Sequence, residues 1–163
     1  VDHVGVGFNY RMTDLQAAIG IAQLERLDDL LAARANVAQL YRERLGEMSA
    51  KVPGMGHDDG LLVPCENQGD ERRSWFVFCV QLPVEVDRAE VIRLLGKRGI
   101  RSKAYLPCIH TMPPYRERFG FEGGEFPVAE RVAERSLALP FFPSITEAEI
   151  GRVCEALAAA LRR

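Results

Sequence analysis

The stretch over residues 75–106 constrains the fold more than any other part of this sequence. Residues 75–82, WFVFCVQL, are rich in aromatic and β-branched side chains, which predicts a buried strand. Asp87 begins a capping box, and the helix that it opens is predicted to stop at Gly99. Residues 100–106 predict a second strand. This strand–helix–strand unit favours an α+β fold, with a small antiparallel or mixed sheet and helices on one face.

A long amphipathic helix is predicted near the start of the chain. Thr13 and Gln16 have the spacing of a capping box, and apolar residues then recur at steps of three and four as far as Leu45. A helix of this length exceeds the usual globular range, so we expect a bend near Asn36. Long helices of this kind cross between domains or line a subunit interface. Gly20 within it indicates a close-packed neighbour.

Weaker signals mark the remaining elements. The expected elements are a loop over residues 46–73 with a short strand at 61–63, an irregular segment over 107–124, a helix over 128–137 introduced by Pro127, an extended apolar segment over 139–143, and a last helix that begins at a capping box of Thr146 and Glu149.

Composition narrows the class of partner. The formal net charge of −2 argues against a nucleic acid or a membrane held by bulk electrostatics, and no apolar run is long enough to span a bilayer. The four cysteines form no C-x-x-C pair, so we expect a reduced, cytosolic protein. Val1 stands where an initiator methionine is usual, which indicates a processed or truncated start.

Two polar segments are candidates for a binding site. Asn9, Tyr10 and Arg11 directly precede a predicted helix start, where backbone N–H groups and the helix dipole favour an anion. Residues 102–110 form a predicted strand that leads into a loop carrying His110, and loops at strand ends often carry function.

Other patterns favour ordinary structure. The run Gly5-Val6-Gly7 follows no predicted strand and lacks a third glycine, so it indicates a turn rather than a phosphate loop. Cys108 and His110 are two residues apart and in a strand would point the same way, which leaves a thiol enzyme as an alternative without an evident third group. The cysteine and histidine spacings match no zinc pattern, so no metal site is expected.

Several blocks of the sequence resemble one known family, in the same order. Residues 7–20, GFNYRMTDLQAAIG, and the following residues 22–27 resemble the segment after the cofactor lysine in DegT/StrS-type sugar aminotransferases. The further similar blocks are Asp87-Arg88 to Gly99-Ile100, Tyr105-Leu106-Pro107 to His110, Pro114-Tyr115-Arg116, Phe126 to Glu130, Leu139 to Pro143, and Thr146-Glu147. These proteins are pyridoxal-phosphate enzymes of the aspartate-aminotransferase fold, fold type I, which aminate keto sugars attached to nucleotides.

The resemblance implies the C-terminal, small-domain part of such an enzyme. Residues 1–46 would then be an interdomain and dimer-interface segment with the long helix, and residues 47–163 an α+β small domain. The complete enzyme is expected to be a homodimer that binds a nucleotide sugar, with glutamate as the amino donor.

The resemblance also implies roles for single residues. Asn9 would reach across the homodimer to the cofactor phosphate bound in the partner subunit, and its amide is a suitable donor for a phosphate. Tyr10 and Arg11 would lie near the nucleotide sugar, and Tyr105 and His110 would line the substrate pocket. Ala104 stands where the first histidine of the family's loop is usual.

The lysines restrict what this chain can do by itself. Lys51, Lys97 and Lys103 are its three lysines, and none occupies the context of a cofactor lysine. Transamination needs such a lysine as covalent anchor and proton-transfer base. We therefore expect pyridoxal phosphate only in the complete enzyme, no catalytic residue in this chain and no activity of the chain alone. The alternative is a stand-alone binding or oligomerisation module that kept the fold without the chemistry.

Overall fold

The computed structural model describes residues 10–49, 60–65, 67, 69–70 and 72–162. In chain order, the elements of these residues are α1 (Asp14–Leu24), α2 (Leu27–Ser49), β1 (Phe78–Gln81), α3 (Arg88–Gly96), β2 (Lys103–Ala104), the 3-10 helix η1 (Ile109–Thr111), α4 (Pro113–Phe119), α5 (Pro127–Arg135), β3 (Ser136–Leu139) and α6 (Glu147–Leu161). No helix of the described residues combines the length and the apolar character that crossing a membrane requires.

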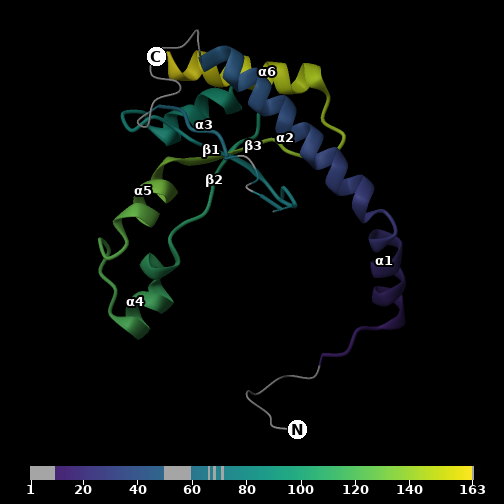
Figure 1. The fold of residues 1–163 in the computed structure, drawn as a ribbon. Coiled ribbons are helices and arrows are strands. Elements are labelled where there is room, and N and C mark those ends of the chain that lie inside the picture. The colour runs from purple at the N-terminus through teal and green to yellow at the C-terminus, as the bar shows by residue number, and fades with distance from the viewer. Residues whose placement is uncertain (1–9, 50–59, 66, 68, 71, 163) are drawn as a thin grey trace.

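The sheet has three antiparallel strands in the order β1-β3-β2. In its register, Phe78 lies opposite Leu139, and Lys103 lies opposite Ala138. The predicted strand–helix–strand unit is present as β1, α3 and β2, but β3 lies between its two strands. Helices α2, α3 and α6 cover one face of this sheet (Figure 1). The α+β class with helices on one face is confirmed.

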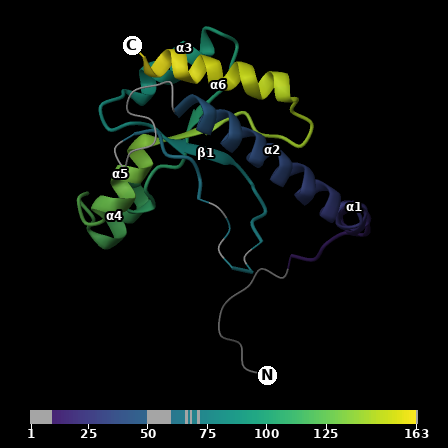
Figure 2. The ribbon, with the colours of Figure 1, turned by 45° about the horizontal axis from the view of Figure 1, so that its top comes forward.

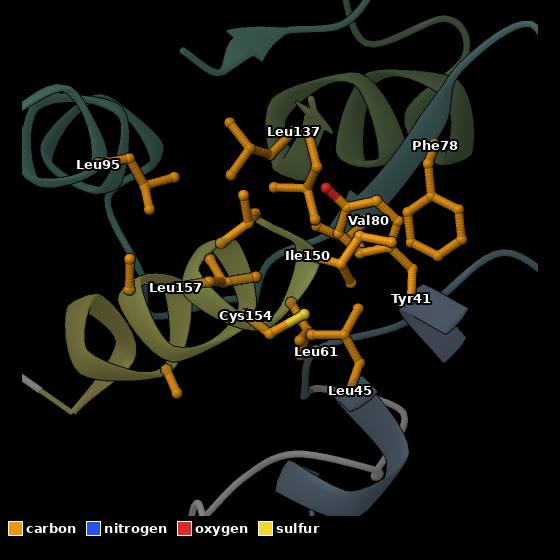
Figure 3. Packing of buried hydrophobic residues seen from close by; sticks show 14 of the residues in the cluster. Tyr41, Leu45, Leu61, Phe78, Val80, Leu95, Leu137, Ile150, Cys154 and Leu157 are labelled. Carbon is orange, nitrogen blue, oxygen red and sulfur yellow. The ribbon is translucent and has the colours of Figure 1, made fainter. Parts of the chain in front are cut away.

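The hydrophobic core lies between the sheet and these three helices. Tyr41 and Leu45 of α2, Phe78 and Val80 of β1, Leu95 of α3, Leu137 of β3, and Ile150, Cys154 and Leu157 of α6 point toward one another (Figure 3). The Tyr41 ring stacks on Phe78 with centroids 4.9 Å apart, and its hydroxyl donates to the Pro140 carbonyl at 2.7 Å. Burial raises the pKa of the Tyr41 phenol, so this hydroxyl keeps its proton and remains a donor.

The predicted long helix is two helices, and the expected bend near Asn36 is wrong. Asn36 lies within an unbroken α2, whereas the break falls at Glu25 and Arg26. There the Arg26 N–H bonds the Gln23 carbonyl at 3.2 Å, an i to i−3 contact that tightens the last turn. The second half of α2 packs in the core, while α1 has no buried residue and lies away from the sheet (Figure 2).

The expected close neighbour of Gly20 is also not found in the described part of the chain. A Cβ atom at Gly20 would meet nothing within 4 Å there.

The predicted strands are shorter in the structure. The run over 75–82 is a strand only at Phe78–Gln81, and Trp75, three residues before the strand, has a left-handed backbone (φ 49°). The run over 100–106 is a strand only at Lys103 and Ala104, and the short strand expected at 61–63 is reduced to bridge pairing, with Leu62 opposite Gln81.

The C-terminal half of the chain contains two differences from the predicted helices. The helix expected over 128–137 is α5, which ends at Arg135, so Ser136 and Leu137 belong to β3. The segment expected to be irregular over 107–124 contains η1 and α4. Helix α4 begins with Pro113 at its first position and ends at Phe119, followed by the C-cap Gly120, whose φ of 73° suits glycine.

The helix caps agree with the sequence at both ends of the chain. Thr13 with Gln16 and Thr146 with Glu149 form complete capping boxes. Asp87 caps α3, with the side chain accepting from the Ala89 N–H at 2.8 Å, while the Glu90 carboxylate pairs with Arg93. Asp87 is therefore the N-cap of α3 as predicted, but the predicted capping box is not complete, because the Asp87 side chain accepts from the N–H of Ala89 and not from that of Glu90.

Candidate functional site

The N-terminal candidates lie before α1. Asn9, like the run Gly5-Val6-Gly7, lies outside the described residues, so its phosphate contact stays a prediction. Tyr10 is 91% exposed and Arg11 is also exposed. Figure 1 places this end of α1 on the opposite side of the molecule from α4 and α5. The described chain therefore does not bring Tyr10 and Arg11 together with the second candidate segment.

The second candidate segment follows the edge strand β2. Tyr105 directly follows this strand and is half-buried, with its N–H 3.4 Å from the Ser136 carbonyl. Ala104 is the last residue of β2. After Pro107 the chain turns into η1, where the carbonyl of Cys108 accepts from the Thr111 hydroxyl at 2.8 Å and from the Thr111 N–H at 3.2 Å. This turn places His110 toward α5.

His110 is the centre of an enclosed polar site. Its Nε2 atom lies 2.7 Å from Oε1 of Glu130, and the side chains of His110 and Glu130 are only 11% and 23% exposed. Phe126 lies against the imidazole with a centroid distance of 4.7 Å, and Phe121 meets it edge-on at 6.0 Å. The site thus joins the turn after β2 to the first turn of α5 through one hydrogen bond and an aromatic enclosure.

Backbone amides orient the two carboxylates of this site. Glu130 accepts from the Gly124 N–H at 2.8 Å, and Glu125 accepts from the N–H groups of Glu122 and Gly123 at 2.7 and 2.8 Å. The hydrogen bond from His110, followed by that from Gly124, lowers the pKa of Glu130. Backbone hydrogen bonds likewise lower the pKa of Glu125. Both groups are therefore ionised over the neutral pH range.

His110, Glu125 and Glu130 also place one possible metal-ligand atom each within 4.8 Å of one another. The prediction of no metal site considered cysteine and histidine spacings, and it did not consider this group of residues. The carboxylate oxygens of both glutamates accept backbone N–H groups, so hydrogen bonding accounts for their orientation.

Sequence reasoning did not identify Glu130 as the partner of His110. The available signal was an acidic residue in the first turn of a helix that Pro127 introduces. The pairing joins residues 20 positions apart, and helix periodicity alone does not reveal it.

The structure changes the basis of the thiol alternative. Cys108 and His110 do not lie on one strand, because Cys108 is the N-cap residue of η1 and His110 is within that 3-10 helix. The expectation that the two side chains point the same way because they lie in one strand is therefore wrong. All four cysteines are free, as expected for a reduced protein, and the cytosolic location stays a prediction.

Comparison with known proteins shows the family to which the chain belongs. The sequence model of the DegT/DnrJ/EryC1/StrS aminotransferase family matches residues 1–158. The chain belongs to this family. It is 36% identical over 154 residues to the GDP-perosamine synthase of Caulobacter vibrioides, an alignment that covers 93% of this chain and 38% of that relative. The chain spans 37–39% of the length of the curated relatives it matches.

Solved structures of longer proteins share the fold. The S. venezuelae protein DesV, solved in complex with a ketimine intermediate, superimposes with a TM-score of 0.77 at 28% identity, over 99% of this chain and 40% of that chain. The Spr1654 protein of Streptococcus pneumoniae, solved in a PLP-form, superimposes with a TM-score of 0.78 at 20% identity, over 98% of this chain and 38% of that chain. The region described here therefore corresponds in fold to part of these longer proteins.

Proposed function

We propose that this chain is the small-domain part of a pyridoxal-phosphate-dependent aminotransferase that acts on nucleotide-linked keto sugars, with glutamate as amino donor. The observation that carries the proposal is the family match over residues 1–158 together with a span of only 37–39% of the relatives. GDP-perosamine synthases among these relatives support a nucleotide sugar as the substrate class.

The lysines of the described chain do not fit a covalent cofactor site. Lys97 is exposed at the C-terminal cap of α3, and Lys103 is exposed on the edge strand β2. Lys51 lies outside the described residues, in a segment that matches the family's small domain. A cofactor lysine needs an enclosed site that tunes its basicity. Our proposal therefore gives the chain a binding role and no transamination by itself.

This binding role uses the residues that the family resemblance suggests. Asn9 contributes an amide donor to the cofactor phosphate across a homodimer, and Tyr10 and Arg11 contact the nucleotide sugar. Tyr105 and His110 supply contacts from the turn after β2. In this proposal, α1 and the residues before it form the segment that packs on the rest of the enzyme, and its exposed apolar side chains support that assignment.

One observation favours a second candidate, the stand-alone binding or oligomerisation module. The described residues from α2 to α6 enclose a continuous hydrophobic core of their own. A core of this kind is what an independently folding unit requires. In that case the chain would fold and associate without any cofactor chemistry.

A chimaeric enzyme tests the leading proposal. Residues 1–163 would replace the matching region of the Caulobacter vibrioides GDP-perosamine synthase, and pyridoxal-phosphate binding and transamination would be measured. We expect a folded, active chimaera. Asn9→Ala should remove one hydrogen bond to a charged group, worth about 1.5–3 kcal/mol, and so weaken cofactor affinity roughly ten- to a hundredfold.

The exposed Arg131→Gln serves as the matched control and should leave cofactor affinity unchanged. A folded chimaera that binds the cofactor but never turns over a keto sugar would contradict the proposal. The isolated chain provides a second test, because it should show no lysine-bound cofactor that borohydride can fix. Such a product in the isolated chain would mean that one of its own lysines is an anchor.

A further inference from the structure

The contact between His110 and Glu130 defines where the imidazole carries its proton. The Nε2 and Oε1 atoms are 2.7 Å apart, which is a hydrogen-bond distance, so one of the two groups must donate. An ionised carboxylate has no hydrogen to donate, whereas either nitrogen of an imidazole can carry one. The donor is therefore assigned once the charge of Glu130 is known.

The surroundings of Glu130 keep it ionised. Besides His110, the Gly124 N–H donates to both of its oxygens at 2.8 and 3.0 Å, and the Phe126 N–H lies 3.4 Å from Oε1. Each of these groups donates and none accepts, so a protonated Glu130 would lose favourable contacts. Glu125, the other charged group of this site, is held by its own backbone donors and carries no proton that it could offer.

The imidazole also has little freedom to turn over. Its side chain is 11% exposed, and Phe126 and Phe121 lie against the ring. A ring flip would move Nε2 away from its acceptor and leave the Glu130 oxygen without this donor. Geometry and hydrogen bonding therefore favour the same ring orientation.

We propose that Glu130 is a positioning residue for His110: it holds the ring proton on Nε2 and leaves Nδ1 as the ring atom that can accept a hydrogen bond. The consequence for a ligand rests on the proposed function. A neutral imidazole of this tautomer accepts through Nδ1, so the ligand group that it selects is a hydrogen-bond donor such as a sugar hydroxyl. A phosphate oxygen, which only accepts, is not selected by this ring while it is neutral.

Nuclear magnetic resonance of the chain tests the tautomer without any ligand. The chain has three histidines, so a His3→Gln/His57→Gln background leaves His110 as the only imidazole. Long-range proton–nitrogen correlations, recorded at a pH where the ring is neutral, distinguish a protonated Nε2 from a protonated Nδ1. We expect Nε2 to carry the proton. A neutral ring protonated on Nδ1 would overturn the proposal, and this measurement needs no variant of Glu130.

Two matched glutamine variants test the cause. In Glu130→Gln the new amide can donate to Nε2, so we expect the Nδ1-protonated form to become populated. Glu125→Gln removes the neighbouring negative charge but not the acceptor of Nε2, so the wild-type tautomer should persist. Amide spectra that match the wild type would show that each variant is folded. A folded Glu130→Gln variant with an unchanged tautomer would contradict the assigned role.

The ligand consequence has a separate readout in the chimaeric enzyme. Glu130→Gln should raise KM for the nucleotide sugar by up to about tenfold, the value of one hydrogen bond, with a smaller change in kcat. An unchanged KM would refute the ligand role while leaving the tautomer assignment intact. An inactive wild-type chimaera would instead count against the proposed function, so the two failures are distinguishable.

Discussion

Glu130 joins two segments through one carboxylate, and its charge makes that junction sensitive to acid. A pKa lowered in the folded chain gives stability that is present above the pKa of the unfolded chain and is lost as the pH falls through the folded value. We expect Glu130→Gln to be less stable than the wild type near pH 7. The difference should shrink below about pH 4, where carboxylates of ordinary pKa become protonated.

Urea unfolding across this pH range measures that difference. The exposed Glu134→Gln variant of the same helix is the control and should follow the wild-type curve at every pH. Glu125 and Glu149 also have lowered pKa values, so part of the acid sensitivity will remain in Glu130→Gln. An equal stability difference at neutral and acid pH would show that the carboxylate charge plays no part.

At the scale of the elements, the two complete capping boxes provide a matched pair. Thr146 caps α6, whose inner face lies in the core, whereas Thr13 caps α1, which has no buried residue. Loss of an N-cap costs about 1 kcal/mol when the helix is part of the cooperative unit. Thr146→Ala should therefore lower the free energy of unfolding by about that amount. Thr13→Ala should reduce helical circular dichroism but change the main transition by less than about 0.5 kcal/mol.

Urea titrations followed by tryptophan fluorescence and by circular dichroism separate the two effects, because the chain's one tryptophan, Trp75, is buried in the core. If Thr13→Ala and Thr146→Ala lowered the free energy of unfolding equally, α1 would belong to the same cooperative unit as α6.

The elements also show which parts of the fold the sequence could predict. Helix caps depend on residues two or three positions apart, so the starts of α1, α3 and α6 were predictable. Strand β3 was not, because its partner residues in β1 lie about sixty positions away and Leu137 continues the apolar spacing of α5. Pro113 and Pro114 stand at the start of α4 and Gly120 stands just after its end, which are positions typical of these residues in helices. Because this segment was expected to be irregular, α4 was not predicted. The pair of His110 and Glu130 depends on packing between segments, which no local pattern contains.

At the scale of the whole molecule, α1 leaves an apolar face uncovered in the described chain. Leu15 is 73% exposed and Ile19 is 58% exposed, one turn apart on the same face. Exposed apolar surface of this kind is unfavourable in water and is usually covered by a partner. We therefore predict that the isolated chain associates with itself, most simply as a dimer through α1. A Leu15→Gln/Ile19→Gln variant should be monomeric at concentrations where the wild type is dimeric.

Sedimentation velocity over a range of concentrations decides this prediction. Val128→Gln is the matched control, because Val128 is an equally exposed apolar residue, at 63%, but lies on α5. If α1 forms the interface, the control associates like the wild type, since its substitution removes apolar area elsewhere. If the control dissociates and the α1 variant does not, the interface lies on the α5 side of the molecule. A wild-type chain that stays monomeric at high concentration would show that the face of α1 is not sufficient for self-association.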